Sequence, residues 1–141
     1  MIKLYTDAAF DLGSGYATVC LVSSYAGRKD WETYDFEDKH NSTEAEYAGI
    51  ELAIKLLAKL GKPGTIYCDS MGAIDYAQKH AEIPEFVRIE HIKGHQLGSH
   101  DIGVDDNVKA HHWADTMAGN ALDRRLAREK TLAYTMRVKE T

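Results

Sequence analysis

Four carboxylates lie at sequence positions where they could bind metal ions. Asp7 in LYTDAAF and Asp69 in IYCDSMG each stand where an apolar, strand-like run ends, and Glu46 and Asp115 lie on predicted helices. Ligands of open α/β sheets bind at the carboxyl edge of the strands. Carboxylates collected there repel one another unless a divalent cation neutralises them, and oxygen ligands suit Mg²⁺ or Mn²⁺ better than zinc. Two such ions about 4 Å apart can activate a water and stabilise a leaving oxygen, so the four residues indicate metal-dependent chemistry on a phosphate ester.

Each carboxylate also has a structural interpretation. Asp69 could equally cap the helix that follows it or form a turn, whereas no helix is predicted to begin at Asp7. Glu46 shares its helix face with apolar residues and is expected to point inward, while Glu44 can remain solvated on another face. Asp115 lies between apolar neighbours on the last predicted helix. A buried, ionised carboxylate needs a partner, and a cation would supply one for Glu46 and Asp115.

Residues 91–115, HIKGHQLGSHDIGVDDNVKAHHWAD, contain five of the seven histidines and suggest a zinc site as an alternative. His111 and His112 are adjacent and would point about 100° apart on a helix, unlike the i, i+4 pair that grips one metal. His91 and His95 are four residues apart but flank a strand end and a glycine turn, and no cysteine is nearby. We therefore expect solvated histidines on a long loop, residues 96–112, at the rim of the site.

The elements that must position these residues follow from periodicity and turn signals. Alternating apolar runs predict strands within residues 2–10 (ending near Asp7), 14–24, 31–38, 64–70 and 85–92. Helical spacing predicts helices over 41–60, capped by Ser42 or Thr43, over 70–80, capped by Asp69 or Ser70, and over 111–130 before a short tail. The order predicts an α/β fold in which a three-strand antiparallel meander is followed by parallel strands, with helices on both faces of the sheet.

Composition describes an ordinary globular chain. Its 141 residues suit one domain, with 44% hydrophobic and 28% charged residues. Cys20 and Cys68 lie in apolar, strand-like runs and are expected to be free, buried thiols in a reducing compartment. The sequence has no apolar run of the roughly 18 residues that span a bilayer and no signal-peptide pattern. We therefore expect a cytoplasmic protein with no membrane partner.

The charge distribution is uneven. The formal net charge of −5 offers no general attraction for nucleic acid. Six basic residues are nevertheless gathered near the C-terminus: Arg124, Arg125, Arg128, Lys130, Arg137 and Lys139. Such a segment can bind a polyanion or can equally be a solvated helix end. We divide the chain into a catalytic domain, residues 1–127, and a partly basic C-terminal tail, residues 128–141.

Five short motifs together resemble the ribonuclease H type 1 family. They are YTDA around Asp7, AEY around Glu46, YCDS around Asp69, KGH ending at His95 and WAD ending at Asp115. Each is common alone, but their order on strand, helix, strand, loop and helix is specific and covers nearly the whole chain. The resemblance implies the RNase H-like fold, with a five-stranded mixed sheet. It also implies endonucleolytic hydrolysis of the RNA strand of an RNA/DNA hybrid with two Mg²⁺ ions, or Mn²⁺ in their place.

The resemblance also implies roles for individual residues. Asp7 looks like the carboxylate that bridges both metals, and Glu46, Asp69 and Asp115 look like the other three ligands. His95 looks like the loop histidine that assists proton transfer or product release. Four short polar residues match positions that contact the nucleic acid: Asn41, Ser42, Thr43 and Ser70.

The chain departs from the family pattern at several places. In the family, the position four residues before the last aspartate is often Asn. Here that position is His111, and the nearest Asn, Asn107, lies eight residues before Asp115. Only one helix fits between Ser70 and Glu85, so the chain resembles the compact form that lacks a basic protrusion. Met71 and Ala8 stand where the family commonly has Gln and Gly, so contacts of these positions with base edges or the minor groove of the nucleic acid are expected to differ.

Other functions stay open at this point. One alternative is another nuclease of the same fold, directed at DNA or at junctions, although the AEY and KGH motifs disfavour it. A non-catalytic binding module is a further alternative, disfavoured by the intact set of carboxylates. The chain could also be the excised RNase H domain of a reverse transcriptase. We expect a monomer.

Overall fold

The computed structural model describes residues 1–93 and 106–140, with side chains at residues 1–93 and 109–136. Eight elements follow one another along the chain: β1 (Ile2–Asp11), β2 (Tyr16–Tyr25), β3 (Arg28–Phe36), α1 (Ser42–Leu60), β4 (Gly64–Cys68), α2 (Met71–His80), β5 (Val87–His91) and α3 (Asp106–Glu140). Their order is the one that the sequence predicts.

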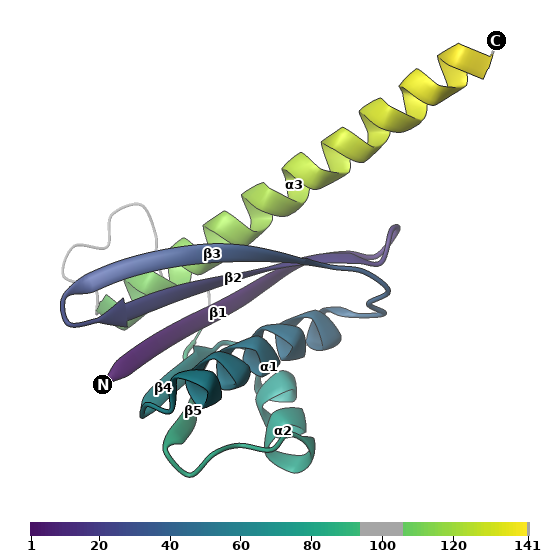
Figure 1. Cartoon of the computed structure of the whole chain (residues 1–141). Helices are drawn as coiled ribbons and strands as arrows, with labels where there is room; N and C mark the ends of the chain where they lie inside the picture. The colour runs from purple at the N-terminus through teal and green to yellow at the C-terminus, as the bar shows by residue number, and fades with distance from the viewer. Residues whose placement is uncertain (94–105, 141) are drawn as a thin grey trace.

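The five strands form one mixed sheet in the spatial order β3-β2-β1-β4-β5. The pairs β1–β2 and β2–β3 are antiparallel, whereas β4 pairs parallel with β1 and β5 pairs parallel with β4. Helices α1 and α2 cover one face and α3 lies across the other (Figure 1). The predicted meander followed by parallel strands, covered on both faces, is therefore confirmed.

Each face of the sheet has its own apolar core. Neighbouring residues of β1 point to opposite faces, so Leu4 packs with α1 and α2 while Tyr5 packs with α3. On the α3 side, the described residues of the helix that are buried in the apolar cluster around Tyr5 are small, namely Ala110, Ala114 and Ala118, spaced four apart. Small side chains on that stripe allow the α3 backbone to approach β1 closely, which brings the first turns of α3 to the centre of the sheet.

The α1 helix is equally close to the sheet on the opposite face. A Cβ added at Gly49 would lie 2.1 Å from Thr6 Oγ1, so only glycine fits there. The helix begins after Asn41, whose side chain accepts from Glu44 N at 2.8 Å. The predicted cap at Ser42 or Thr43 is wrong by one or two positions, because Asn41 supplies the oxygen and both of those residues are already helical.

Helix α3 is longer than predicted. It begins at Asp106 rather than near 111, so the expected loop over 96–112 ends earlier, and it continues to Glu140 through the segment expected to be a tail. Residues 127–136 are exposed along it, and Figure 1 shows this end of α3 extending away from the sheet. The division into a domain of residues 1–127 and a tail of residues 128–141 stays a prediction.

Arg125 joins α3 to the strands and is not a solvated charge. Its side chain is buried, donates to Phe36 O at 2.9 Å and to Glu37 Oε1 at 3.3 Å, and lies 3.8 Å from the ring centre of Tyr16. Of the basic cluster near the C-terminus, this residue is therefore engaged within the fold.

Two further expectations are tested by the fold. Cys20 and Cys68 are free and buried, as the sequence predicts. Within the part of the chain that the structure describes, no helix combines the length and the apolar character needed to cross a membrane.

Candidate active site

Asp7 and Asp69 meet where the parallel part of the sheet ends. β4 pairs with β1 only as far as Tyr5, and it stops at Cys68, directly before Asp69. β1 itself does not end near Asp7, as the sequence analysis expected, but runs on to Asp11 because β2 continues to pair with it. The expected strand end is thus wrong, yet Asp7 still lies at the edge of the parallel strands. The carboxyl edge of such strands is where α/β proteins bind ligands.

Glu46 reaches the same place from α1. It is 9% exposed, which agrees with its place on the inward face of the helix. The backbone N–H of Ala8 donates both to Asp7 Oδ1 at 2.9 Å and to Glu46 Oε1 at 3.3 Å. One shared donor therefore holds these two carboxylates next to each other.

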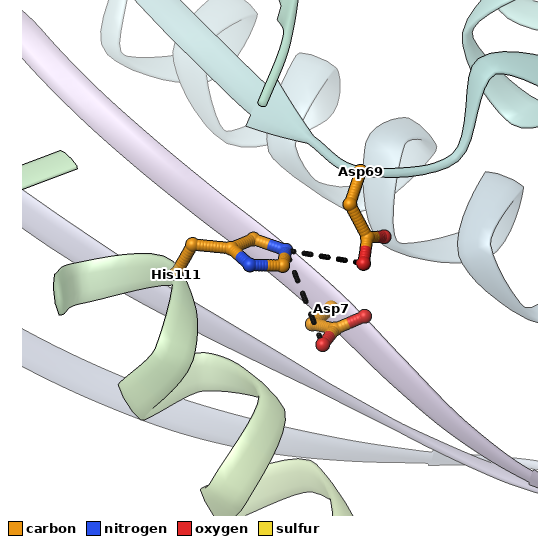
Figure 2. A group of neighbouring side chains, drawn as sticks. All are labelled: Asp7, Asp69 and His111. Carbon is orange, nitrogen blue, oxygen red and sulfur yellow. Dashed lines mark ion pairs between the residues drawn. The ribbon is translucent and has the colours of Figure 1, made fainter. Parts of the chain in front are cut away.

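Asp69 is not used as a helix cap. Ser70 caps α2 instead, accepting from Ala73 N at 3.2 Å, which decides between the two interpretations of Asp69. The carboxylate of Asp69 is partly exposed and points toward Asp7 in Figure 2. It therefore remains available as a ligand.

Asp115 completes the group from α3 on the opposite face of the sheet. It is partly buried, and it lies close enough to Asp7 and Glu46 to raise the pKa of both carboxyls. Four carboxylates from β1, α1, the end of β4 and α3 are thus brought together.

The electrostatics of this group favour a cation. Burial, and next the charge of Glu46, raise the pKa of Asp7 far above its usual range, and burial also raises the pKa of Glu46. Asp7 Oδ2 is buried and has no hydrogen-bond partner among the described residues. A divalent cation would favour the ionised forms and supply a partner for that oxygen. The donor set of carboxylate oxygens therefore fits Mg²⁺ or Mn²⁺.

Cys68 lies behind Glu46 and plays a different part. Its thiol donates to Glu46 Oε2 at 3.9 Å, and its backbone position is at the end of β4. Burial, and next the charge of Glu46, raise the pKa of this thiol, so it stays protonated. Cys68 therefore supports Glu46 as a hydrogen-bond donor. Its Sγ also lies within 4.8 Å of possible ligand atoms of Glu46 and Asp69, but a thiolate is a poorer ligand for Mg²⁺ or Mn²⁺ than a carboxylate.

His111 is the residue that the sequence analysis misplaced. It was expected to be solvated on the loop, but it is 3% exposed on α3, and its Nε2 lies 3.9 Å from Asp7 Oδ2 and 3.8 Å from Asp69 Oδ2 (Figure 2). The predicted helix over 111–130 already included His111, but α3 begins at Asp106 and packs against β1 from Ala110 onward, so His111 is buried within the helix instead of lying at its solvated start. It shares a face with Asp115, four residues later. That four-residue spacing in HHWAD was the available signal.

The remaining predicted site residues are placed as follows. His95 lies outside the described residues. Asn41 and Ser70 both use their side chains as helix caps, and Ser42 and Thr43 are exposed in the first turn of α1. Thr43 lines a surface hollow of about 270 Å³ together with Lys39, His40, Tyr47 and other residues. Contact of these residues with nucleic acid stays a prediction.

Comparisons with known proteins support the fold. No family model and no curated protein matches the sequence. Among solved structures, the RNase H domain of prototype foamy virus matches with a TM-score of 0.62 and 18% identity, over 84% of this chain and 92% of that domain. LC11-RNase H1, isolated from compost by a metagenomic approach, matches with a TM-score of 0.60 and 16% identity, over 89% of this chain and 97% of that one.

A longer protein also matches. The prototype foamy virus protease-reverse transcriptase is similar with a TM-score of 0.62 and 19% identity over 84% of this chain, which spans only 20% of that protein. At such identities the similarity establishes architecture, and the five-stranded sheet with three helices in the same arrangement is the RNase H-like fold.

Proposed function

We propose that this chain, which has the ribonuclease H fold, is a metal-dependent endonuclease that hydrolyses the RNA strand of an RNA/DNA hybrid. The observation that carries the proposal is the convergence of Asp7, Glu46, Asp69 and Asp115 from four separate elements around a buried Asp7 oxygen. A structural role does not explain such a group, because gathering like charges in a partly buried place destabilises the fold unless a cation is bound.

The four carboxylates would divide the work by position. Asp7 is the most buried of the four and lies near each of the other three, so it could offer its two oxygens to different ions, while Asp115 joins the group from α3. A pair of divalent ions held here would supply an activated water and stabilise the leaving oxygen of the phosphodiester. His95 is proposed to move a proton to or from the reacting groups, as the family resemblance implies.

The substrate would be bound mainly through its backbone. The N-terminus of α1, with Asn41, Ser42 and Thr43, is exposed and offers the partial positive charge of a helix start to a phosphate. Recognition of RNA would depend on 2′-hydroxyls in the minor groove and on the shape of the hybrid, so cleavage would be largely independent of sequence. We also propose that the protein is a cytoplasmic monomer.

A nuclease assay tests the proposal. Labelled RNA/DNA hybrid, double-stranded DNA and double-stranded RNA are each incubated with the protein in Mg²⁺, in Mn²⁺ and in excess chelator. We expect cleavage of the hybrid RNA strand only, dependent on the metal. Asp7→Asn should lower the rate at least about 10³-fold, because it removes the central anionic ligand.

Asp123→Asn is the matched control, since Asp123 is an exposed carboxylate on the same helix as Asp115. It should cleave like the wild type. Cleavage of DNA alone would favour a DNA-directed nuclease of the same fold, and cleavage that persists in Asp7→Asn would refute the mechanism.

A further inference from the structure

Given the proposed function, on which this inference rests, we infer that His111 is a nitrogen ligand of an ion held between Asp7 and Asp69, and that it gives the site a preference for Mn²⁺ over Mg²⁺. The inference adds a fifth residue to the four carboxylates and assigns it a chemical consequence. No role for His111 follows from the motifs in the sequence.

The distances fit one shared ion. Two atoms that each lie about 2.1 Å from the same ion are at most about 4.2 Å apart. His111 Nε2 is 3.9 Å from Asp7 Oδ2 and 3.8 Å from Asp69 Oδ2, within that limit and longer than a hydrogen bond. The ligand atoms of all three residues lie within 4.8 Å of one another, so a small rotation of the partly exposed Asp69 is enough to complete the set.

The fold holds the imidazole in this place. His111 follows Ala110 on α3 beside the buried alanine stripe, its side chain is buried, and its ring points toward Asp7 and Asp69 (Figure 2). Asp7 Oδ2, the oxygen nearest to Nε2, is also the buried oxygen without a hydrogen-bond partner among the residues the structure describes. Nitrogen and oxygen thus face the same small volume from α3 and β1.

The chemistry of the donors predicts the selectivity. Mn²⁺ and Mg²⁺ both favour oxygen ligands. As a first-row transition metal, however, Mn²⁺ accepts an imidazole nitrogen more readily than Mg²⁺, which keeps to carboxylate, phosphate and water oxygens. Replacing an oxygen donor by His111 should therefore strengthen Mn²⁺ binding relative to Mg²⁺. His111→Asn removes the ring nitrogen, keeps a polar side chain, and should bring the two affinities closer together.

The experiment measures metal binding directly. Titration calorimetry gives Kd for Mn²⁺ and for Mg²⁺, and pulsed electron paramagnetic resonance of the Mn²⁺-loaded protein detects a bound imidazole by its ¹⁴N coupling. We expect the wild type to show the coupling and His111→Asn to lose it. In that variant Kd for Mn²⁺ should rise about 10-fold, while Kd for Mg²⁺ should change less than about 3-fold.

His112→Asn is the matched control, because His112 is the exposed neighbour on the same helix. It should keep both the coupling and the ratio of affinities. Since His111 is buried, circular dichroism checks that His111→Asn folds. Wild-type protein labelled with ¹⁵N-histidine gives a readout that needs no variant, because the ¹⁴N coupling must then be replaced by a ¹⁵N coupling.

The outcomes separate the two proposals. A wild type that neither binds Mn²⁺ nor cleaves the hybrid overturns the proposed function. A wild type that binds Mn²⁺ and cleaves the hybrid, but shows no histidine coupling or keeps it in His111→Asn, overturns the role of His111 alone.

Discussion

At the scale of single residues, the site is a balance between burial and charge. Asp7 is 3% exposed and faces other carboxylates, so the metal-free fold favours its neutral form and raises its pKa. A bound cation, as proposed, would reverse this preference. Without an ion, the clustered carboxylates are therefore expected to lower the free energy of unfolding of the protein.

The first prediction concerns pH and stability without metal. The pKa of Asp7 in the folded chain is raised above its usual 3.8, so above about pH 4 the folded chain keeps a proton that the unfolded chain releases. The free energy of unfolding of the metal-free chain therefore falls as pH rises toward the folded pKa. Asp7→Asn removes this penalty. Its free energy of unfolding should exceed that of the wild type by at least about 1.4 kcal/mol at pH 7, one pKa unit, and by much less at pH 4.

Urea unfolding in chelator at several pH values measures this difference, with Asp123→Asn as the control that should stay equal to the wild type. A difference that shrinks as pH rises would contradict the argument. Adding Mn²⁺ should stabilise the wild type and leave Asp7→Asn nearly unchanged, because only the wild type retains the central ligand.

At the scale of elements, two helices bring the proposed metal ligands to opposite sides of one strand. α1 approaches β1 through Gly49, and α3 approaches it through the alanine stripe that includes Ala110 and Ala114. Glu46 lies one turn before Gly49, and His111 and Asp115 each follow one of those alanines. The close packing of both helices is therefore what sets the spacing between carboxylates.

The second prediction tests this packing at Gly49. Gly49→Ala would place a Cβ 2.1 Å from Thr6 Oγ1, and α1 must shift away from β1. We expect a loss of about 1–3 kcal/mol in the free energy of unfolding and reduced cleavage, because Glu46 moves with the helix. Thermal and urea unfolding with the hybrid assay measure both effects.

Gly119→Ala is the matched control, since a Cβ there meets nothing within 4 Å. Gly119 is in the interior of α3, where alanine favours the helix by about 1 kcal/mol, so this variant should be equally or more stable. If Gly49→Ala behaved like Gly119→Ala, the close approach of α1 would not be what positions Glu46.

At the scale of the whole molecule, the packed body ends well before the chain does. Among the α3 side chains that the structure describes, Arg125 is the last long one buried against the strands, and residues 127–136 are exposed. The body thus contains every described residue proposed for catalysis, while the outer part of α3 adds length and charge.

The third prediction follows from that arrangement. A chain shortened to residues 1–127 should fold, with a midpoint of thermal unfolding within a few degrees of the full chain, because the removed residues that the structure describes bury little surface. It should cleave hybrid in Mn²⁺ at saturating substrate. Circular dichroism and the nuclease assay check both points, and Arg125→Ala is the contrasting variant.

Arg125→Ala should be destabilised by about 2–4 kcal/mol, because it leaves Phe36 O without its donor and removes the contact with Tyr16. A shortened chain as unstable as Arg125→Ala would show that the outer helix is part of the domain.

Much of this protein was determined by local sequence. Strand alternation, helix period and turn residues predicted the order of elements, and they placed Asp69 after a strand end and Glu46 on an inward helix face, whereas the strand end predicted near Asp7 was wrong. These features depend on neighbours within a few residues, so they can be inferred from the chain alone. The motifs added the identity of the last carboxylate, Asp115.

Tertiary structure alone decided the parts that depend on distant packing. His111 became a neighbour of Asp7 and Asp69 because the small residues of α3 pack against β1, and the four-residue spacing from Asp115 gives the shared helix face but not the partners across it. Arg125 belongs to a basic segment that the sequence suggested could be solvated, but its side chain is buried because it contacts Phe36 and Tyr16, about a hundred residues earlier in the chain. Periodicity reports which face a residue occupies, but the partner across that face is set only when separate elements pack together.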